Sequence, residues 1–194
     1  MKIRMGITGG IGSGKSVVSH LLEVLGVPVY ISDTETRALM VEDEQIRSGL
    51  VALLGEEVYV SGGLNKPLLA AYIFSDPAHA AMVNALVHPR VKEDFRRWAR
   101  TLPDKQVVGI ESAILLEAGF RDEVDVVVMV YAPEEVRIAR AMRRDEASWE
   151  AVVQRIRSQM DDDEKRAKAD VVIVNDGVTP VLPQVMHLVQ KLLL

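Results

Sequence analysis

Eight consecutive residues, Gly9 to Ser16, form the clearest candidate for chemistry in this sequence. They match the pattern G-x-x-x-x-G-K-[ST] at every fixed position. Glycines allow backbone geometries that other residues avoid, so successive N–H groups can converge on phosphate oxygens. Lys15 would then reach the β- and γ-phosphates, and the hydroxyl of Ser16 would bind Mg²⁺. A plain glycine turn is the alternative, but an apolar strand before the loop and an amphipathic helix after it favour a nucleoside triphosphate site.

A carboxylate follows the next predicted strand. Asp33 comes two residues after the run Val27–Ile31, and the carboxyl end of that strand should open onto the same crevice as the loop. An aspartate there could accept the proton of an attacking hydroxyl group. Asp33 also fits the N-cap of a helix over Thr34–Met40, a role that is compatible with catalysis.

Six arginines gather in a short stretch of the second half of the chain. They are Arg137, Arg140, Arg143, Arg144, Arg155 and Arg157. The same stretch contains only three acidic residues, Asp145, Glu146 and Glu150. The spacing of Arg137, Arg140 and Arg144 predicts one helical face that could present guanidinium groups to a polyphosphate. A solvated helix face paired to nearby acids is the alternative. In a chain with a phosphate loop, the stretch predicts a mobile lid that stabilises the transferred phosphoryl group and excludes water.

The absence of several motifs reduces the number of nucleotide-binding protein classes that fit the chain. Guanine selection commonly uses N-K-x-D, but here Asn65-Lys66-Pro67 is followed by Leu68, and D-x-x-G is absent. An ATPase motor would show a hydrophobic strand ending in an acid pair, and Glu111 is the nearest approach. These absences favour a small kinase over a GTPase switch or a motor.

The elements that must position these residues follow an alternation of strands and helices. Short runs rich in Val and Ile predict five strands, and helical periodicity separates them, which is typical of an α/β fold with a parallel sheet. The predicted strands are Lys2–Thr8, Val27–Ile31, Gln106–Ile110, Asp125–Tyr131 and Val171–Asn175. A helix is predicted over Lys15–Leu25, with its apolar residues on one face.

Two longer intervals do not fit simple crossovers between neighbouring strands. Residues 34–101 predict a mostly helical lobe, and residues 137–168 predict the lid. The remaining residues, about 1–33, 102–136 and 169–194, would form the core of one P-loop NTPase domain, and Thr179-Pro180 would start its final helix.

Composition excludes several other classes of protein. The chain has 194 residues, 48% hydrophobic and 26% charged, which suits one globular domain. A net charge of −5 argues against nucleic acid or anionic membranes as partners. No cysteine is present, so disulfides and thiolate chemistry are excluded, and a reducing, cytoplasmic location is expected because the N-terminal stretch also lacks the apolar core of a signal peptide.

Taken in order along the chain, these residues resemble the dephospho-CoA kinase family over nearly the whole length. The matching positions are Thr8 to Ser16, Asp33, Ile73-Phe74, His88-Pro89, Leu115, Glu117, Arg140, Arg144, Arg155 to Met160, Glu164 to Asp170, Asn175 and Gly177. The sequence departs from the family pattern at Val17, Ile31, Ala113 and Val174, but not at Lys15, Ser16 or Asp33.

The resemblance implies transfer of the γ-phosphoryl group of ATP to the 3′-hydroxyl of dephospho-CoA. It implies Asp33 as the base and Lys15, Arg140 and Arg144 as further catalytic residues. It also implies that the helical lobe of residues 34–101 binds the acceptor, with Asp33, His88 and Glu117 as acceptor contacts. The implied nucleotide contacts are Gly10, Ile11, Gly12, Ser13, Gly14, Lys15, Ser16, Val17 and Asn175, with Mg²⁺ on Ser16. A nucleoside or nucleoside-monophosphate kinase and a nucleotide-binding regulator without an acceptor are the alternatives; the oligomeric state stays open.

Overall fold

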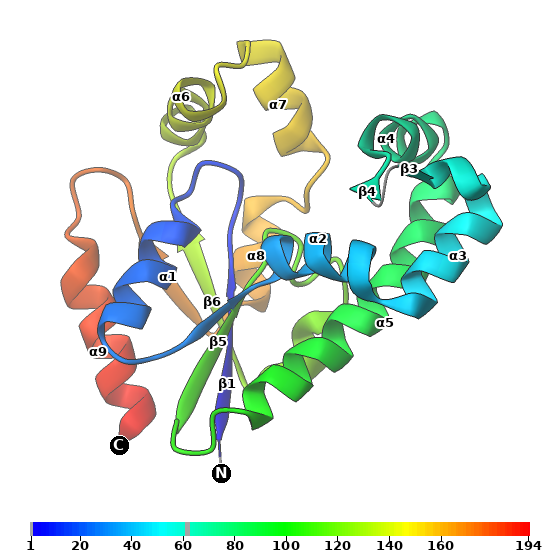
Figure 1. The fold of residues 1–194 in the computed structure, drawn as a ribbon. Helices are drawn as coiled ribbons and strands as arrows, with labels where there is room; N and C mark the ends of the chain where they lie inside the picture. The colour runs from blue at the N-terminus through cyan, green and yellow to red at the C-terminus, as the bar shows by residue number, and fades with distance from the viewer. Residues whose placement is uncertain (1, 61–62) are drawn as a thin grey trace. The chain divides into compact units, whose positions relative to one another are not determined.

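The computed structural model of the chain describes residues 2–60 and 63–194 (Figure 1). Two compact units are distinguished. The first contains the residues up to Ile31 and those from Thr101 to Leu194, and the second contains Ser32 to Arg100.

A parallel sheet forms the centre of the first unit. Among the described residues it has five strands in the order β2-β5-β1-β6-β7, and every pairing in it is parallel. The strands are β1 (Ile3–Thr8), β2 (Val29–Ile31), β5 (Val107–Glu111), β6 (Val126–Tyr131) and β7 (Val171–Val174). The five predicted strands and the α/β class are therefore confirmed, each boundary lying within two residues of its prediction.

Buried aliphatic side chains explain why these runs become sheet strands. Most of the residues of β5 and β6 are buried, as expected of parallel strands covered on both faces. Helices α1 (Lys15–Val24) and α9 (Val181–Leu193) pack against each other beside the sheet (Figure 1). Their apolar stripes join one core that includes Met5, Leu22 and Leu188.

The register brings the carboxyl ends of the central strands to one edge of the sheet. Ile7 in β1 is level with Glu111 in β5, and Tyr131 in β6 is level with Val174 in β7. The phosphate loop after β1, the segment after β5 and Asn175 after β7 consequently leave the sheet at the same edge. This is where open α/β sheets bind ligands.

Three helices and a short 3₁₀ turn complete the first unit. They are α6 (Glu134–Asp145), α7 (Trp149–Arg157), α8 (Asp162–Lys168) and η2 (Phe120–Glu123). Ile138 and Ala141 of α6 pack against Val152 and Val153 of α7, so these two helices share a small apolar core of their own.

The second unit is mostly helical. It contains α2 (Ser32–Glu42), α3 (Glu44–Leu54), α4 (Lys66–Ser75) and α5 (Pro77–Arg100), with η1 (Glu56–Val58) and the short antiparallel pair β3 (Tyr59–Val60) and β4 (Gly63–Leu64). Asp43 caps α3 by accepting from the amides of Gln45 and Ile46, and it also pairs with Arg90 of α5 at 2.7 Å. In the described part of the chain, no helix has the length and apolar character needed to span a membrane.

Candidate active site

The phosphate loop turns sharply between β1 and α1. Gly12 and Gly14 have φ values of 79° and 92°, which side-chain-bearing residues rarely adopt. The amide of Ser13 donates to the carbonyl of Gly10 at 3.1 Å, and α1 closes its first turn from Val17 to Gly14 at 3.0 Å. The loop therefore delivers the chain directly into the N-terminus of a helix, which favours anions.

Cationic and hydroxyl groups lie where the sequence pattern requires them. Lys15 Nζ donates to the carbonyl oxygens of Gly9 at 3.0 Å and of Gly10 at 3.3 Å, so its charge is held over the loop. Ser16 and Val17 are exposed in the first turn of α1. This turn contains no acidic residue that would repel a phosphate.

A hydroxyl at this position fits a magnesium site that is completed by phosphate oxygens. Mg²⁺ prefers oxygen ligands and usually keeps several waters, with few ligands from the protein. The exposed Ser16 hydroxyl supplies one such oxygen. Elsewhere in residues 2–60 and 63–194, no group of three or more histidine or acidic side chains is arranged to hold a metal ion.

Other segments approach the loop so closely that its glycines leave no room for side chains. A Cβ atom on Gly10 would lie 2.0 Å from a guanidinium nitrogen of Arg137, and one on Gly12 would lie 2.2 Å from the carbonyl oxygen of the same arginine. A Cβ atom on Gly14 would lie 2.1 Å from the side-chain nitrogen of Asn175. The glycines thus serve packing as well as backbone geometry.

Asn175 connects the end of β7 to the loop. Its backbone amide donates to the carbonyl of Tyr131 at 2.8 Å, and its side-chain amide donates to the carbonyl of Ser13 at 2.8 Å. The structure therefore brings Asn175 and the loop together, as the sequence-based assignment of both to nucleotide binding requires.

Three of the four arginines of α6 take different partners. Arg137 is 4% exposed and pairs with Asp162 at 2.7 Å. Arg140 donates to the carbonyl of Asn175 at 2.8 Å, while Arg144 is exposed and pairs with its neighbour Asp145 at 2.7 Å. Only Arg137 and Arg140 thus contact the loop or a residue bound to it, and Arg144 takes a nearby acid instead.

The pKa values of the two acids beside these arginines are shifted in opposite directions. Burial raises the pKa of Asp162 above its usual value, although Arg137 and Lys165 act against that shift. Hydrogen bonds from Arg144, and next from Arg155, hold the pKa of Asp145 at about 2. Asp145 therefore links α6 to α7 as a carboxylate at neutral pH.

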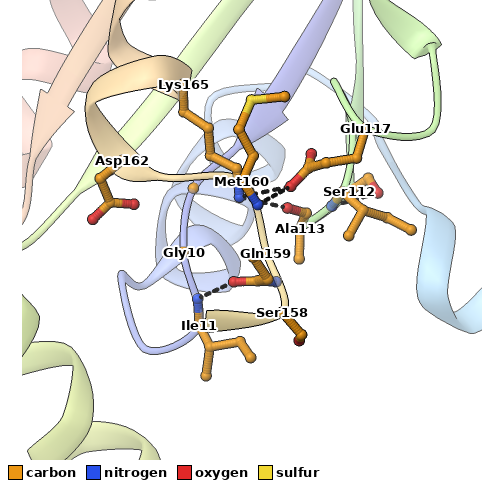
Figure 2. A network of polar contacts seen from close by, with 12 residues as sticks. Gly10, Ile11, Ser112, Ala113, Glu117, Ser158, Gln159, Met160, Asp162 and Lys165 are labelled. Carbon is orange, nitrogen blue, oxygen red and sulfur yellow. Dashed lines mark hydrogen bonds and ion pairs between the residues drawn. The ribbon is translucent and has the colours of Figure 1, made fainter. Parts of the chain in front are cut away.

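Glu117 lies in a polar network with residues that follow α7 (Figure 2). One of its carboxylate oxygens accepts from the backbone amide of Met160 at 2.9 Å and pairs with Lys165 Nζ at 3.1 Å. Lys165 also donates to the carbonyl of Ala113 at 3.1 Å. Glu111, the last residue of β5, accepts a hydrogen bond of 2.6 Å from Ser19 of α1.

The other two predicted residues belong to the second unit. Asp33 is exposed and is the second residue of α2, so its prediction as an N-cap is wrong: the helix already begins at Ser32 because the chain passes from β2 into α2 without an intervening turn. His88 is half-buried in α5, and burial, followed by the charge of Lys92, lowers its pKa. His88 is therefore neutral at pH 7.

Comparison with known proteins now decides the family. The family model of dephospho-CoA kinase matches residues 3–180. This chain belongs to the dephospho-CoA kinase family. A dephospho-CoA kinase of Bacteroides fragilis is 58% identical over 189 residues, which cover 97% of this chain and 92% of that protein. The predicted family is thereby confirmed.

Solved structures share the fold. A Thermus thermophilus protein is 34% identical with a TM-score of 0.82, and the match covers 99% of this chain and 96% of that one. A dephospho-CoA kinase from Campylobacter jejuni has a TM-score of 0.71 at 22% identity, covering 98% and 97%. The five-stranded P-loop kinase fold predicted from the sequence is confirmed.

Sequence reasoning missed three residues that contact the loop or support those that do. The sequence places Arg137 in the arginine-rich stretch but does not predict its contact with the loop. Gln159 and Lys165 stand out in the sequence only as positions that match the family. Gln159 accepts a hydrogen bond from the amide of Ile11 at 3.1 Å. Their partners are distant in sequence, so no local pattern predicts these contacts, and the burial of Arg137 and Lys165 is seen only in the structure.

Proposed function

We propose that this chain transfers the γ-phosphoryl group of ATP to the 3′-hydroxyl of dephospho-CoA, giving CoA and ADP, the last step of coenzyme A biosynthesis. Membership of the dephospho-CoA kinase family over residues 3–180 carries the proposal, because that match includes the whole phosphate loop and the arginine segment. A kinase of this fold supplies little covalent chemistry and acts by positioning and by stabilising charge.

Residues of the loop would bind the triphosphate of ATP. Lys15, now on the carbonyls of Gly9 and Gly10, would move its ammonium group to the β- and γ-phosphates, while the loop amides hold phosphate oxygens. The Ser16 hydroxyl would hold Mg²⁺, which neutralises charge on the phosphates when it is bound. Arg140 and Arg144 would stabilise the transferred group, and Asn175 would lie near the adenine.

The acceptor hydroxyl requires a base. Asp33 is exposed in the first turn of the helical unit, and its carboxylate would take the proton as the acceptor oxygen attacks phosphorus and ADP leaves. His88 and Glu117 are the further proposed acceptor contacts. A cytoplasmic location is proposed because the cysteine-free sequence suits a reducing compartment.

A panel of acceptors tests this function. Purified protein is incubated with Mg-ATP and, separately, dephospho-CoA, nucleosides, nucleoside monophosphates or no acceptor, and products are separated by chromatography. We expect CoA and ADP in equal amounts from dephospho-CoA only. A phosphorylated nucleoside would replace the substrate assignment, and nucleotide binding without any phosphorylated product would identify a regulator.

The assignment of the base is tested by Asp33→Asn. Asparagine keeps the size of the side chain but cannot accept the proton, so we expect turnover to fall by about 10²–10⁴-fold while ATP binding is retained. Thr34→Ser, a neighbouring exposed change, is the control. Turnover near that of the control would remove Asp33 from the mechanism.

A further inference from the structure

Gln159, which lies between α7 and α8, connects this segment to the phosphate loop. Its side-chain oxygen Oε1 accepts a hydrogen bond from the Ile11 amide at 3.1 Å (Figure 2). Because a backbone amide can only donate, this contact fixes which end of the Gln159 side chain faces the loop. The bond joins residues that are 148 positions apart in the sequence, and it adds a direct hydrogen bond to the packing of Ile11 against the core of α6 and α7.

The backbone beside Gln159 is itself anchored. The amide of the next residue, Met160, donates to Glu117 at 2.9 Å, and the same carboxylate oxygen lies 3.1 Å from Lys165 Nζ. Figure 2 shows Lys165, Glu117 and Ala113 converging next to Met160 and Gln159. The anchor thus fixes the place from which Gln159 extends to Ile11.

Burial makes this anchor rigid. The side chain of Lys165 is fully buried, and its charge is satisfied by the Glu117 carboxylate and by the Ala113 carbonyl at 3.1 Å. A buried charge that lost these partners would be strongly unfavourable, so Lys165 keeps one arrangement. Ala113 and Glu117 lie just after β5, at the same edge of the sheet as the loop, which connects the anchor to the rigid core.

We propose that Gln159 positions the phosphate loop for ATP, and that Lys165 and Glu117 are positioning residues that act through Gln159. The inference rests on the proposed function. By accepting from the Ile11 amide, Gln159 holds the loop in the conformation in which the remaining loop amides bind phosphate oxygens. A loop that reaches this conformation only part of the time binds its ligand more weakly by the same fraction.

The decisive variant is Gln159→Leu, with Gln154→Leu as its matched control. Leucine removes the acceptor oxygen at similar volume, and Gln159 borders an open cavity of ≈ 410 Å³ that leaves room for it. Gln154 is exposed on α7, in the same segment of the chain. We expect the Michaelis constant for ATP to rise about fivefold, the equivalent of one neutral hydrogen bond, with that for dephospho-CoA unchanged.

Lys165→Met and Glu117→Leu test the anchor. Each should raise the Michaelis constant for ATP by a similar factor, and neither should add to the effect of Gln159→Leu on that constant in a double variant, because all three act on one contact. Glu117→Leu also removes a proposed acceptor contact, so its effect on the constant for ATP is the one that tests the anchor. Michaelis constants do not depend on how much of a destabilised variant is folded. If these two variants do not fold, Gln159→Leu alone decides.

Two results would overturn the proposal. One is a Michaelis constant for ATP in Gln159→Leu within twofold of that in Gln154→Leu. The other is a rise only in the constant for dephospho-CoA, which would assign the segment to the acceptor. If wild-type protein formed no CoA, the proposed function would fail by itself, and calorimetric ATP affinities of the same variants would still test the positioning of the loop.

Discussion

The phosphate loop and the arginine segment both predict phosphate binding from sequence, but their contacts in the structure are determined in different ways. The loop consists of consecutive residues whose turns and helix start are set by its own glycines and by Lys15. The arginines of α6 share helical spacing, yet their partners are Asp162, Asn175 and Asp145. A contiguous motif fixes its own geometry, whereas spacing on a helix does not decide what each side chain contacts.

The two regions also depend on each other. Arg137, one of the arginines whose spacing predicts a face presented to a polyphosphate, packs on Gly10 and Gly12. The loop therefore has two kinds of support: its internal hydrogen bonds and the contacts supplied by Arg137 of α6.

The largest effect should come from the loop itself. Lys15→Ala removes the cation held over Gly9 and Gly10, and we expect the turnover number to fall by about 10²–10³-fold, as when one transition-state donor is lost. Steady-state kinetics measures this, with Lys191→Ala on α9 as the control. Turnover within threefold of the control would mean that the loop does not act on phosphate.

The second prediction distinguishes the two reasons for a glycine in the loop, its positive φ and its close contact with Arg137. Gly12 and Gly26 both have positive φ, 79° and 84°, but a Cβ on Gly12 would meet Arg137 whereas one on Gly26 meets nothing within 4 Å. Gly26→Ala should cost about 1 kcal/mol of unfolding free energy, and Gly12→Ala about 1–3 kcal/mol more together with weaker ATP binding. Denaturant unfolding and calorimetry measure these; equal costs would show that Arg137 does not constrain the loop.

The same difference between local and distant partners explains what the sequence could predict. Strands such as Val126–Tyr131 follow from hydrophobic pattern, and the phosphate loop follows from eight consecutive residues. The contacts of Gln159 and Lys165 join residues 148 and 52 positions apart, to Ile11 and Ala113. Such contacts form only when the sheet brings distant segments together, so they cannot be predicted from hydrophobic periodicity or motif spacing.

The third effect should divide the arginines. Arg140 is partly buried and bonded to Asn175, which holds the loop, while Arg144 is exposed and paired with Asp145. We expect Arg140→Ala to lower the turnover number about tenfold and Arg144→Ala about threefold, because solvent screens the exposed charge. Steady-state kinetics of the two alanine variants measures both losses of turnover. A larger loss in Arg144→Ala would show that Arg144 leaves Asp145 and contacts ATP when the nucleotide binds.

The smallest effect concerns the link between α6 and α7. Arg144 and Arg155 lower the folded-state pKa of Asp145 from 3.8 to about 2, so its ion pairs stabilise the fold fully above pH 3.8 and lose that contribution as the pH falls toward 2. The melting temperature of Asp145→Asn should lie slightly below that of wild type at pH 7, and the gap should stay constant to about pH 4 and then narrow. Glu146→Gln, an exposed neighbour, should show no such pH-dependent gap. A gap that stays constant down to pH 3 would show that Asp145 acts through its hydrogen bonds and not through its charge.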